Sequence, residues 1–372
     1  MSRNGSKNGF SRRGLIAATG VAAAQAQTGR QPVVVNPAPQ VALQRAQGTP
    51  IRIVTMYKFE PHEVEQIRNA AAGANVEIII AQSREEYRRR LRDAEVVYGG
   101  MSGADLDFAP GLKWVQSGGA GVENMDDKFR ASPIVMTNYA GVFAPGISET
   151  AMGLLLALSR GLVRHYLPQF YLKKTMAPVG TPKSDDHVEL VGRTMGIVGM
   201  GGIGTAIAKR AYYGFDMRII GIDPKPMRKP HFVDELHPPS YFAKMVPQVD
   251  VLVAAAPHTK QTERMFNEQV FRSMKRTAYF LAMSRGKLYD ENALVKVLKE
   301  HRIAGAGLDV FPTEPVPPNH PIFECDNVIM SAHTSGWSPD RQVRLIELFA
   351  ENVRRYAAGE PLMNVVDKPK GY

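Results

Sequence analysis

The sequence has almost no cysteine, and this scarcity excludes two kinds of site. Cys325 is the only cysteine among 372 residues, so the chain cannot form an internal disulfide or assemble a thiolate metal site. We therefore expect no bound metal. One cysteine alone does not indicate a compartment.

The sequence also lacks a basic block and a long hydrophobic run. The formal net charge is +10, but the first thirty residues hold five basic side chains and no acidic one. Without them, 41 basic residues stand against 36 acidic ones, spread along the chain. Nucleic acid is not an expected partner, because a phosphate-binding footprint needs clustered charge. The apolar run from Gly14 to Ala24 is far shorter than the ~20 residues of a membrane-spanning helix.

The N-terminus resembles a twin-arginine export signal. Arg12 and Arg13 precede the apolar run, and the triplet Ala24-Gln25-Ala26 offers a small-residue cleavage site. Residues 27–49 are rich in Gln, Pro and Ala, as linkers are, so residues 1–49 are assigned to an export signal and linker. This predicts a periplasmic protein with no membrane attachment once the signal is removed. The alternative to an export signal is a disordered N-terminus, with the protein located in the cytoplasm.

From Ile51 onwards the pattern alternates between strands and helices. Short β-branched runs separated by helical pieces predict parallel sheets covered on both faces, and the length favours two domains. The first series has strands at 51–57, 75–80, 95–100, 112–119 and 133–138, with helices from about Pro61 and over 84–94. The second has strands at 194–200, 217–223, 249–257, 277–283, 303–310 and 327–333.

Two long helices are predicted outside these strands. Residues 144–166 predict one helix of more than twenty residues, and a polar stretch, 167–192, separates it from the second series. After the last strand, residues 338–359 predict another helix, begun by Ser338 as cap and Pro339 in the first turn. The predicted fold class is therefore α/β.

The stretch MGIVGMGGIGTAIAKR indicates a strand that turns on glycines into a helix. Gly199, Gly201 and Gly204 have the G-x-G-x-x-G spacing. The first glycine permits a tight turn, the second lets the backbone approach a pyrophosphate, and the third lets helix and strand pack closely. The free amides and positive dipole end of the helix N-terminus favour phosphates.

An acid at the end of the next strand supports a dinucleotide site. Asp223 lies nineteen residues after Gly204, where it can accept hydrogen bonds from the adenosine ribose hydroxyls and would repel a 2′-phosphate. This favours NAD as the cofactor. NADP stays possible, because Lys225, Arg228 and Lys229 lie close enough to soften the repulsion.

Three polar residues end successive strands of the second series: Arg285 in MSRG, Glu314 in DVFPTEP and His333 in SAHTSGW. Nicotinamide chemistry on an alcohol or ketone needs a proton donor and acceptor, a cation for the oxygen, and a group that orients the acid–base residue. In a doubly wound sheet such groups sit at the carboxyl ends of strands. Singly, each could be an ordinary loop or core residue; together, behind a dinucleotide turn, they predict a catalytic set.

From about Ile51 to Tyr372 the chain resembles the D-isomer-specific 2-hydroxyacid dehydrogenases, the family of hydroxypyruvate and glyoxylate reductases, phosphoglycerate dehydrogenases and D-lactate dehydrogenases. The stretches that carry the resemblance are GAGVENMD, VGMGGIGTAIAKR, PHTKQTERMFN, MKRTAYFLAMSRGKLYDENAL, AGAGLDVFPTEP, NVIMSAHTSG and GEPLMNVVD. It implies two Rossmann-like doubly wound domains. The NAD-binding domain, 145–334, is inserted into a discontinuous flavodoxin-like substrate domain, 50–144 and 335–372. It also implies a homodimer formed through the nucleotide domain.

The resemblance implies a role for each catalytic candidate. Arg285 would hold the substrate carboxylate and the C2 oxygen, and His333 would exchange the hydroxyl proton while hydride passes between C2 and the nicotinamide. Glu314 would hydrogen-bond the imidazole and favour its protonated form. The implied cofactor-binding set is Gly199, Gly201, Gly202, Ile203, Gly204, Asp223, Pro257, His258, Ala282, Asp309 and His333.

On the substrate side, the resemblance assigns the carboxylate to the backbone amides of Ala120 and Gly121 in GGAGVE. Tyr57 and Met101 are candidates for the wall around the C3 substituent. The substrate would be a small 2-keto or 2-hydroxy acid, and the sequence does not say which.

The chain departs from the family pattern at several positions. Glu123 stands where the family often has Asp, Ala282 where it often has Asn, and Ala332 where Pro often precedes the histidine. None of these removes a proton-transfer group, but the two alanines could alter loop placement. Glu314, rather than the glutamine of formate dehydrogenases, argues against formate. The sequence shows no regulatory domain after NVVDKPKGY, which weakens 3-phosphoglycerate as the substrate.

The predicted function is interconversion of a D-2-hydroxy acid and its 2-keto acid with NAD(H). The alternative is an NAD-sensing binding protein with little turnover, like the corepressors that resemble this family. Export would require the enzyme to carry its cofactor in the folded state, which the twin-arginine route allows.

Overall fold

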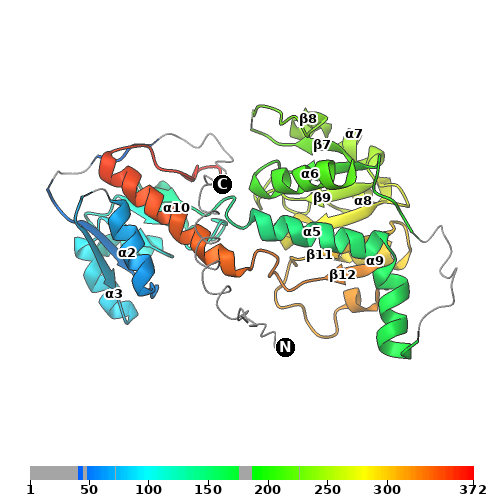
Figure 1. Cartoon of the computed structure of the whole chain (residues 1–372), viewed down its shortest axis with the longest axis horizontal. Helices are drawn as coiled ribbons and strands as arrows, with labels where there is room; N and C mark the ends of the chain where they lie inside the picture. The colour runs from blue at the N-terminus through cyan, green and yellow to red at the C-terminus, as the bar shows by residue number, and fades with distance from the viewer. Residues whose placement is uncertain (1–40, 45–47, 72, 176–186, 226) are drawn as a thin grey trace, which may run out of the picture. The chain divides into compact units, whose positions relative to one another are not determined.

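The computed structural model describes residues 41–44, 48–71, 73–175, 187–225 and 227–372, which contain two parallel sheets with helices packed on them (Figure 1). The predicted twin-arginine signal, most of the predicted linker and part of the polar stretch 167–192 lie outside the described residues. Among those described, no single helix has the length and apolarity to cross a membrane. One helix pair bent by 60°, Ala144–Ser159 with Leu162–Lys173, matches a span by length and composition only.

The first sheet has five parallel strands in the order β2-β1-β3-β4-β5. The strands are β1 (Ile51–Thr55), β2 (Val76–Ile80), β3 (Val96–Tyr98), β4 (Trp114–Gln116) and β5 (Val135–Thr137). This is the flavodoxin-like strand order, and its direction reverses between β1 and β3. The predicted fold class is thus confirmed for this half of the chain.

The helices of this sheet come from both ends of the described chain. They are α2 (Pro61–Ala70), α3 (Arg84–Arg90), α4 (Asp127–Ala131) and α10 (Pro339–Ala358). In Figure 1, α10 lies beside α2, and Phe349 of α10 packs its ring 4.6 Å from that of Tyr98. Ser338 caps α10 as predicted, accepting a hydrogen bond from the amide of Arg341. The C-terminal segment therefore completes the core of the first sheet.

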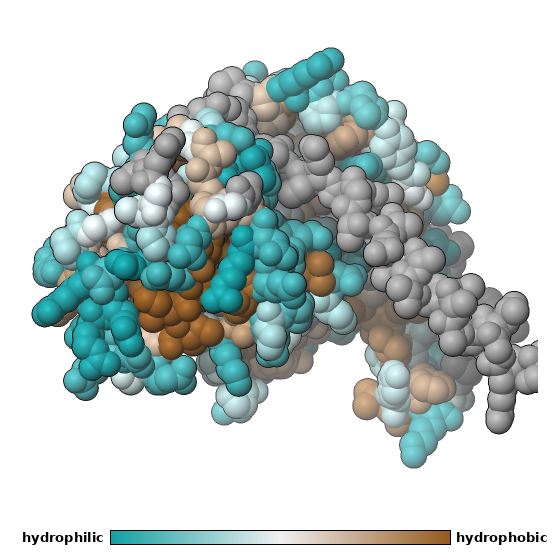
Figure 2. All heavy atoms as spheres, turned by 60° about the vertical axis from the view of Figure 1, so that its left-hand side comes forward, coloured by the Kyte–Doolittle hydropathy of each residue, from teal (hydrophilic) through white to brown (hydrophobic). Residues whose placement is uncertain are grey.

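The edge of the first sheet is partly apolar. β2 is an edge strand, and an open groove lined by Arg68 and residues 74–79 runs along it. Figure 2 brings forward the left-hand side of Figure 1 and shows apolar surface framed by hydrophilic side chains.

The second sheet has seven parallel strands in the order β12-β11-β10-β9-β6-β7-β8. The strands are β6 (Thr194–Val198), β7 (Arg218–Ile222), β8 (Glu235–His237), β9 (Val251–Ala254), β10 (Tyr279–Ala282), β11 (Gly305–Leu308) and β12 (Val328–Met330). The direction of the order reverses between β6 and β9, as in a dinucleotide-binding sheet. Strand β8 was not predicted, because Glu-Leu-His has no β-branched residue.

The helices on the second sheet are α5 (Ala144–Ser159), α6 (Gly202–Phe215), α7 (Phe242–Met245), α8 (Glu268–Ser273) and α9 (Glu291–Lys299). The prediction of one helix over 144–166 was wrong in its extent. The α-helix ends at Ser159, Gly161 takes the left-handed region at φ 69°, and π-helical turns follow over Leu162–Tyr166 and Gln169–Lys173. A glycine can adopt this conformation without steric cost, and here it breaks the helix.

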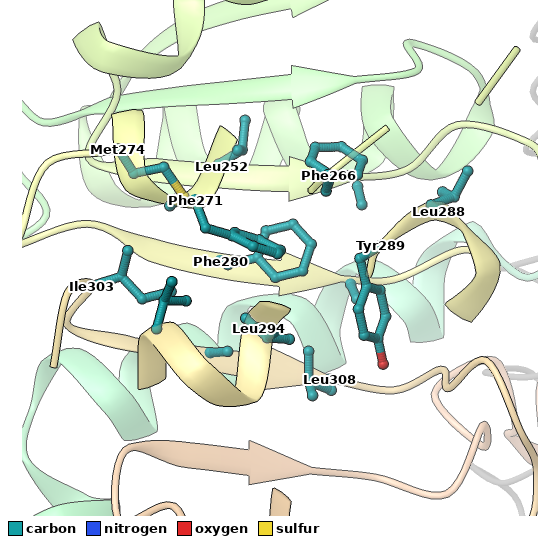
Figure 3. Packing of buried hydrophobic residues seen from close by; sticks show 14 of the residues in the cluster. Leu252, Phe266, Phe271, Met274, Phe280, Leu288, Tyr289, Leu294, Ile303 and Leu308 are labelled. Carbon is teal, nitrogen blue, oxygen red and sulfur yellow. The ribbon is translucent and has the colours of Figure 1, made fainter. Parts of the chain in front are cut away.

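An aromatic cluster on the second sheet supports the ends of its strands (Figure 3). Phe280 of β10 packs against Phe271 of α8, with ring centroids 5.1 Å apart, and against Tyr289, at 5.9 Å. The buried hydroxyl of Tyr289 donates a 2.9 Å hydrogen bond to the carbonyl of Val310. This bond joins the segment that follows β10 to the segment that follows β11, and these two segments carry Arg285 and Glu314.

Candidate active site

The glycine turn after β6 is built around close backbone contacts. Gly199 has φ 94°, and a Cβ atom there would lie 2.6 Å from the backbone of Ala256. A Cβ on Gly204 would lie 2.0 Å from the carbonyl oxygen of Gly199, whereas one on Gly201 would meet nothing within 4 Å. The first and third glycines therefore permit tight packing, and the second leaves the turn open to a ligand.

The amides at the start of α6 are available to an anion. The first one with a backbone acceptor is that of Thr205, which donates to the carbonyl of Gly201 at 2.9 Å. The amides of Gly202 and Ile203 precede it, so the helix itself offers them no acceptor. An open glycine turn followed by free helix amides fits a pyrophosphate. The residues present therefore suit the dinucleotide predicted from the sequence.

Asp223 lies beside this turn. One carboxylate oxygen accepts a 2.9 Å hydrogen bond from the amide of Met200 inside the turn, and the other accepts one of 2.9 Å from the amide of Lys225. Burial lowers the pKa of Lys225, while Asp223 and Asp367 act in the opposite direction. Lys229 instead donates to the carbonyl of Val233 at 2.7 Å. Of the three cations expected near the acid, the structure thus ties Lys225 closely to it.

The three catalytic candidates stand at one edge of the second sheet. Arg285, Glu314 and His333 follow β10, β11 and β12, which are adjacent parallel strands. Nδ1 of His333 lies 2.8 Å from Oε2 of Glu314, and Oε1 of Glu314 accepts a 2.9 Å hydrogen bond from the amide of Phe311. The histidine is exposed, and Nε2 of its ring has no hydrogen-bond partner among the described residues. That nitrogen is free to exchange a proton.

The loop that carries His333 is held in place by the buried side chain of Asp309, which is 1% exposed. Its carboxylate accepts hydrogen bonds from both the amide and hydroxyl of Ser335, from the hydroxyl of Ser331 at 2.7 Å and from the amide of Thr334 at 3.1 Å. Its backbone carbonyl accepts the amide of His333 at 2.8 Å. Asp309 was predicted as a cofactor residue, and that role stays a prediction. Its support of the histidine loop was not foreseen.

Arg285 reaches a loop of the first sheet. Its Nε lies 2.6 Å from Oε1 of Glu123, and its Nη1 donates to the carbonyl of Ser284 at 2.7 Å. Burial raises the pKa of Glu123, but the hydrogen bond and charge of Arg285 outweigh it and hold that pKa below its usual value. A Cβ atom on Gly121 would lie 1.9 Å from Nη2 of Arg285. The structure thus brings Arg285 onto the predicted carboxylate-binding loop.

That loop is ordered by Asn138, whose side-chain amide donates to the carbonyl of Ala120 at 2.8 Å. The pairing of Arg285 with Glu123 was not predicted, although Glu123 had been noted as a departure from the family pattern. The two residues are 162 positions apart. No local signal in the sequence connects them.

The remaining predicted residues have varied surroundings. Pro257 and His258 follow β9, and the buried Nε2 atom of His258 has no hydrogen-bond partner among the described residues; Glu263 lies 3.8 Å from it. Ala282 is fully buried, and its carbonyl accepts the amide of Asp309 at 3.0 Å. A buried imidazole nitrogen without a hydrogen-bond partner fits a bound ligand.

The two candidates for the C3 wall follow strands of the first sheet, Tyr57 after β1 and Met101 after β3. Tyr57 is 40% exposed and accepts a 2.8 Å hydrogen bond from the side chain of Gln342 in α10. Burial and Glu63 raise the pKa of Tyr57. Met101 packs at the margin of a separate apolar cluster that includes Val97 and Val115. Their roles stay predictions.

In the described part of the chain, no group of three or more His, Cys, Asp or Glu side chains could hold a metal ion.

Comparison with known proteins places this site in a family. The family model described as D-isomer specific 2-hydroxyacid dehydrogenase, NAD binding domain, matches residues 152–335. A glyoxylate reductase of Korarchaeum cryptofilum is 38% identical over 269 residues, which cover 71% of this chain and 78% of that protein.

Solved structures share the fold of this chain. The TT0316 protein of Thermus thermophilus matches with TM-score 0.66 and 28% identity, covering 85% of this chain and 99% of the other. A D-isomer specific 2-hydroxyacid dehydrogenase from Xanthobacter autotrophicus, solved with NADPH and MES, has TM-score 0.72 and 22% identity over 86% and 99% of the chains. At that identity the likeness concerns the fold.

Proposed function

The chain belongs to the D-isomer-specific 2-hydroxyacid dehydrogenase family, and from this premise we propose that it interconverts a small 2-keto acid and the corresponding D-2-hydroxy acid with NAD(H). Family membership makes it an NAD(P)-dependent oxidoreductase acting on a CH–OH group. Glyoxylate is the first substrate to test, because the related archaeal proteins are named glyoxylate reductases.

The observation that carries the proposal is the hydrogen-bonded pair of His333 and Glu314 at the strand edge that also bears Arg285. A carboxylate on Nδ1 orients the imidazole and stabilises its protonated form, so that Nε2 can act as the acid. The neighbouring guanidinium supplies N–H donors for a carboxylate and a keto oxygen.

The residues divide the reduction between them. Arg285 binds the substrate carboxylate and polarises the C2 carbonyl, with the amides of Ala120 and Gly121 as further donors. A nicotinamide cofactor held by the glycine turn and Asp223 would supply the hydride for C2. His333 then gives the proton on Nε2 to the C2 oxygen and regains one from solvent, and in the oxidative direction it accepts the hydroxyl proton.

The cofactor proposed is NAD, with NADP possible. Asp223, hydrogen-bonded to the turn at Met200, favours an unmodified ribose, because a 2′-phosphate would meet its negative charge. Lys225 beside it weakens that discrimination.

The test is a substrate panel on the purified protein. Glyoxylate, hydroxypyruvate, pyruvate and phenylpyruvate are each combined with NADH and with NADPH, and absorbance at 340 nm is followed. We expect turnover of at least one keto acid, faster with NADH. Binding of NADH without turnover of any of them would reject the proposal in favour of the alternative, an NAD-sensing binding protein of the corepressor type.

The residue assignment is tested with His333→Asn. Loss of the general acid should lower kcat/KM by a factor of about 10²–10⁴. His301→Asn is a matched control, because His301 also has positive φ, 46° against 54°, and the same 47% side-chain exposure. Full activity in His333→Asn would refute the assignment.

Two further proposals rest on the sequence. Arg12 and Arg13 before a short apolar run support export of the folded, cofactor-loaded enzyme, and the resemblance supports a homodimer. Cell fractionation should find a shortened chain in the periplasm, and an uncleaved chain found only in the cytoplasm would reject export. Light scattering should give twice the chain mass, and a monomer would reject the dimer.

A further inference from the structure

We infer that Glu123 is a positioning residue that orients the guanidinium of Arg285 for the substrate. The inference deepens the proposed function and rests on it, because it takes Arg285 as the group that binds the keto acid. It adds a residue from the loop that follows β4 of the first sheet to a site whose other charged groups all follow strands of the second sheet.

The hydrogen bonds of Arg285 leave room for a ligand. A guanidinium has five N–H groups. Nε donates to Oε1 of Glu123 at 2.6 Å, Nη2 lies 3.5 Å from Oε2, and Nη1 donates to the carbonyl of Ser284 at 2.7 Å. These contacts engage one N–H on each nitrogen. One N–H on Nη1 and one on Nη2 remain, which is the number that a carboxylate or a carboxylate and keto oxygen can accept in parallel.

The loop at Gly121 fixes where that pair of donors lies. A Cβ atom on this residue would stand 1.9 Å from Nη2 of Arg285 and 2.4 Å from Oε2 of Glu123. Both charged groups therefore rest directly on the backbone of Gly121. This packing places the free N–H groups beside the loop whose amides are assigned to the substrate carboxylate. The absence of a side chain at Gly121 is what permits the approach.

The opposite charges and the partial burial of Arg285 and Glu123 stabilise their contact, so that Glu123 can orient the arginine side chain. The pKa of Glu123 is held low by Arg285 against the effect of its burial, and the neighbouring His258 acts in the same direction. The side chains of Arg285 and Glu123 are only 28% and 31% exposed, so solvent screens the pair less than a surface pair. Without its partner, a long arginine side chain would sample several rotamers, and binding would have to restrict them.

The first experiment separates substrate binding from chemistry. We compare kcat and KM for the preferred keto acid, at saturating NADH, in the wild type, Glu123→Ala and Glu123→Gln. Glu123→Ala should raise KM by about tenfold, the effect of losing one orienting hydrogen bond. It should lower kcat by a smaller factor, about threefold, because the same guanidinium also polarises the C2 carbonyl. Glu123→Gln keeps an acceptor for Nε and should recover part of the loss. The Kd for NADH should not change.

Glu77→Ala is the matched control, because Glu77 forms an exposed ion pair with Arg52 on the first sheet, at 3.0 Å. It removes the same charge from the same sheet and should leave KM unchanged. An equal rise in KM in both variants would overturn the inference, since it would then reflect charge alone.

The second experiment asks whether Glu123 acts through Arg285. Lysine has no Nε or planar fork to orient, so in an Arg285→Lys background Glu123→Ala should change KM by less than about twofold. An undiminished tenfold effect would show that Glu123 acts elsewhere and would overturn the inference. If Arg285→Lys turns over too slowly, the same comparison is made on the Kd of oxamate, measured by quenching of NADH fluorescence in the enzyme–NADH complex.

The two proposals fail in different ways. A wild-type protein that turns over no keto acid rejects the proposed function. A wild-type protein that is active, together with a Glu123→Ala variant of unchanged KM, rejects only the positioning role.

Discussion

The two sheets each turn from a strand into a helix at the point where their strand order reverses, and the two turns are chemically opposite. After β1, helix α2 begins with acidic residues: the buried Glu63 accepts a 2.9 Å hydrogen bond from the amide of Glu60. After β6, helix α6 begins with glycines and has no acid in its first turn. One helix N-terminus is already satisfied by a carboxylate, and the other is free for an anion.

This difference shows that the sheet topology does not decide which half binds the dinucleotide. Both sheets have a doubly wound order, and both offer a helix at the right place. The residues of the turn determine which half binds the dinucleotide. An acidic side chain at a helix N-terminus accepts hydrogen bonds from the helix amides and repels a phosphate. Function therefore has to be argued from the turn and not from the fold.

The largest effect is expected from Gly199→Ala. Its Cβ would strike the backbone of Ala256 at 2.6 Å, and φ 94° is strained for alanine. We expect loss of about 2–4 kcal/mol of stability and at least tenfold weaker NADH binding, measured by thermal unfolding and fluorescence titration. Gly73→Ala is the control: Gly73 has φ 92° with nothing within 4 Å of a Cβ, so it should cost about 1 kcal/mol and leave NADH binding intact. Equal NADH affinity in both variants would contradict the role of the turn.

A smaller effect is expected from Asp223→Asn. Removing the negative charge beside the turn should shift the ratio of kcat/KM values for NADH and NADPH by about tenfold toward NADPH, as the loss of about 1.4 kcal/mol of discrimination would. The same substitution of Asp367, which faces Lys225 from the C-terminal segment, should shift the ratio less. An unchanged ratio in Asp223→Asn would remove this acid from cofactor selection.

The pH dependence of KM should test whether the ion pair between Glu123 and Arg285 supports substrate binding. The pKa of Glu123 is lowered in the folded protein, so the ion pair with Arg285 persists as pH falls through the ordinary range of glutamate and is lost only below it. KM for the keto acid should therefore stay flat from neutral pH to about pH 4 and rise a few-fold below it. Glu123→Gln should show no such rise. A rise beginning near pH 6 in the wild type would point to another group.

The smallest effect is expected at the first turn, from Glu63→Ala. The substitution removes the acceptor of the Glu60 amide and should lower the free energy of unfolding by about 1 kcal/mol, measured in urea. Because α2 is not proposed to bind the cofactor, the Kd for NADH should stay the same. A weaker NADH complex would mean that the two turns are not as separate in function as their chemistry indicates.

Much of the fold could be predicted, because the buried parallel strands are short runs of β-branched residues that are recognisable in the sequence. Strand β8 could not, since Glu235–His237 owes its extended form to pairing with β7 and not to its own residues. The break at Gly161 was also missed, because the sequence does not indicate whether a glycine inside a helical pattern is tolerated or ends the helix.

The candidate site could likewise be predicted only in part. Arg285, Glu314 and His333 could be proposed because each follows a recognisable strand, and the glycine turn has a fixed spacing. The contacts that hold them could not be found in this way. Asp309 supports the His333 loop through two serines and a threonine, and Glu123 meets Arg285 across 162 positions of sequence. Such partners are set by tertiary packing and have no local pattern.

The attachment of Arg285, Glu314, His333 and the glycine turn to a single sheet has a consequence for engineering. The spacing of Glu314 and His333 is fixed by that sheet and by the buried Asp309. Tyr57 and the loop at Ala120, which also carries Glu123, follow strands of the other sheet. If the proposed roles hold, a library of variants confined to the latter positions can explore new substrates while His333 and Glu314 keep their alignment.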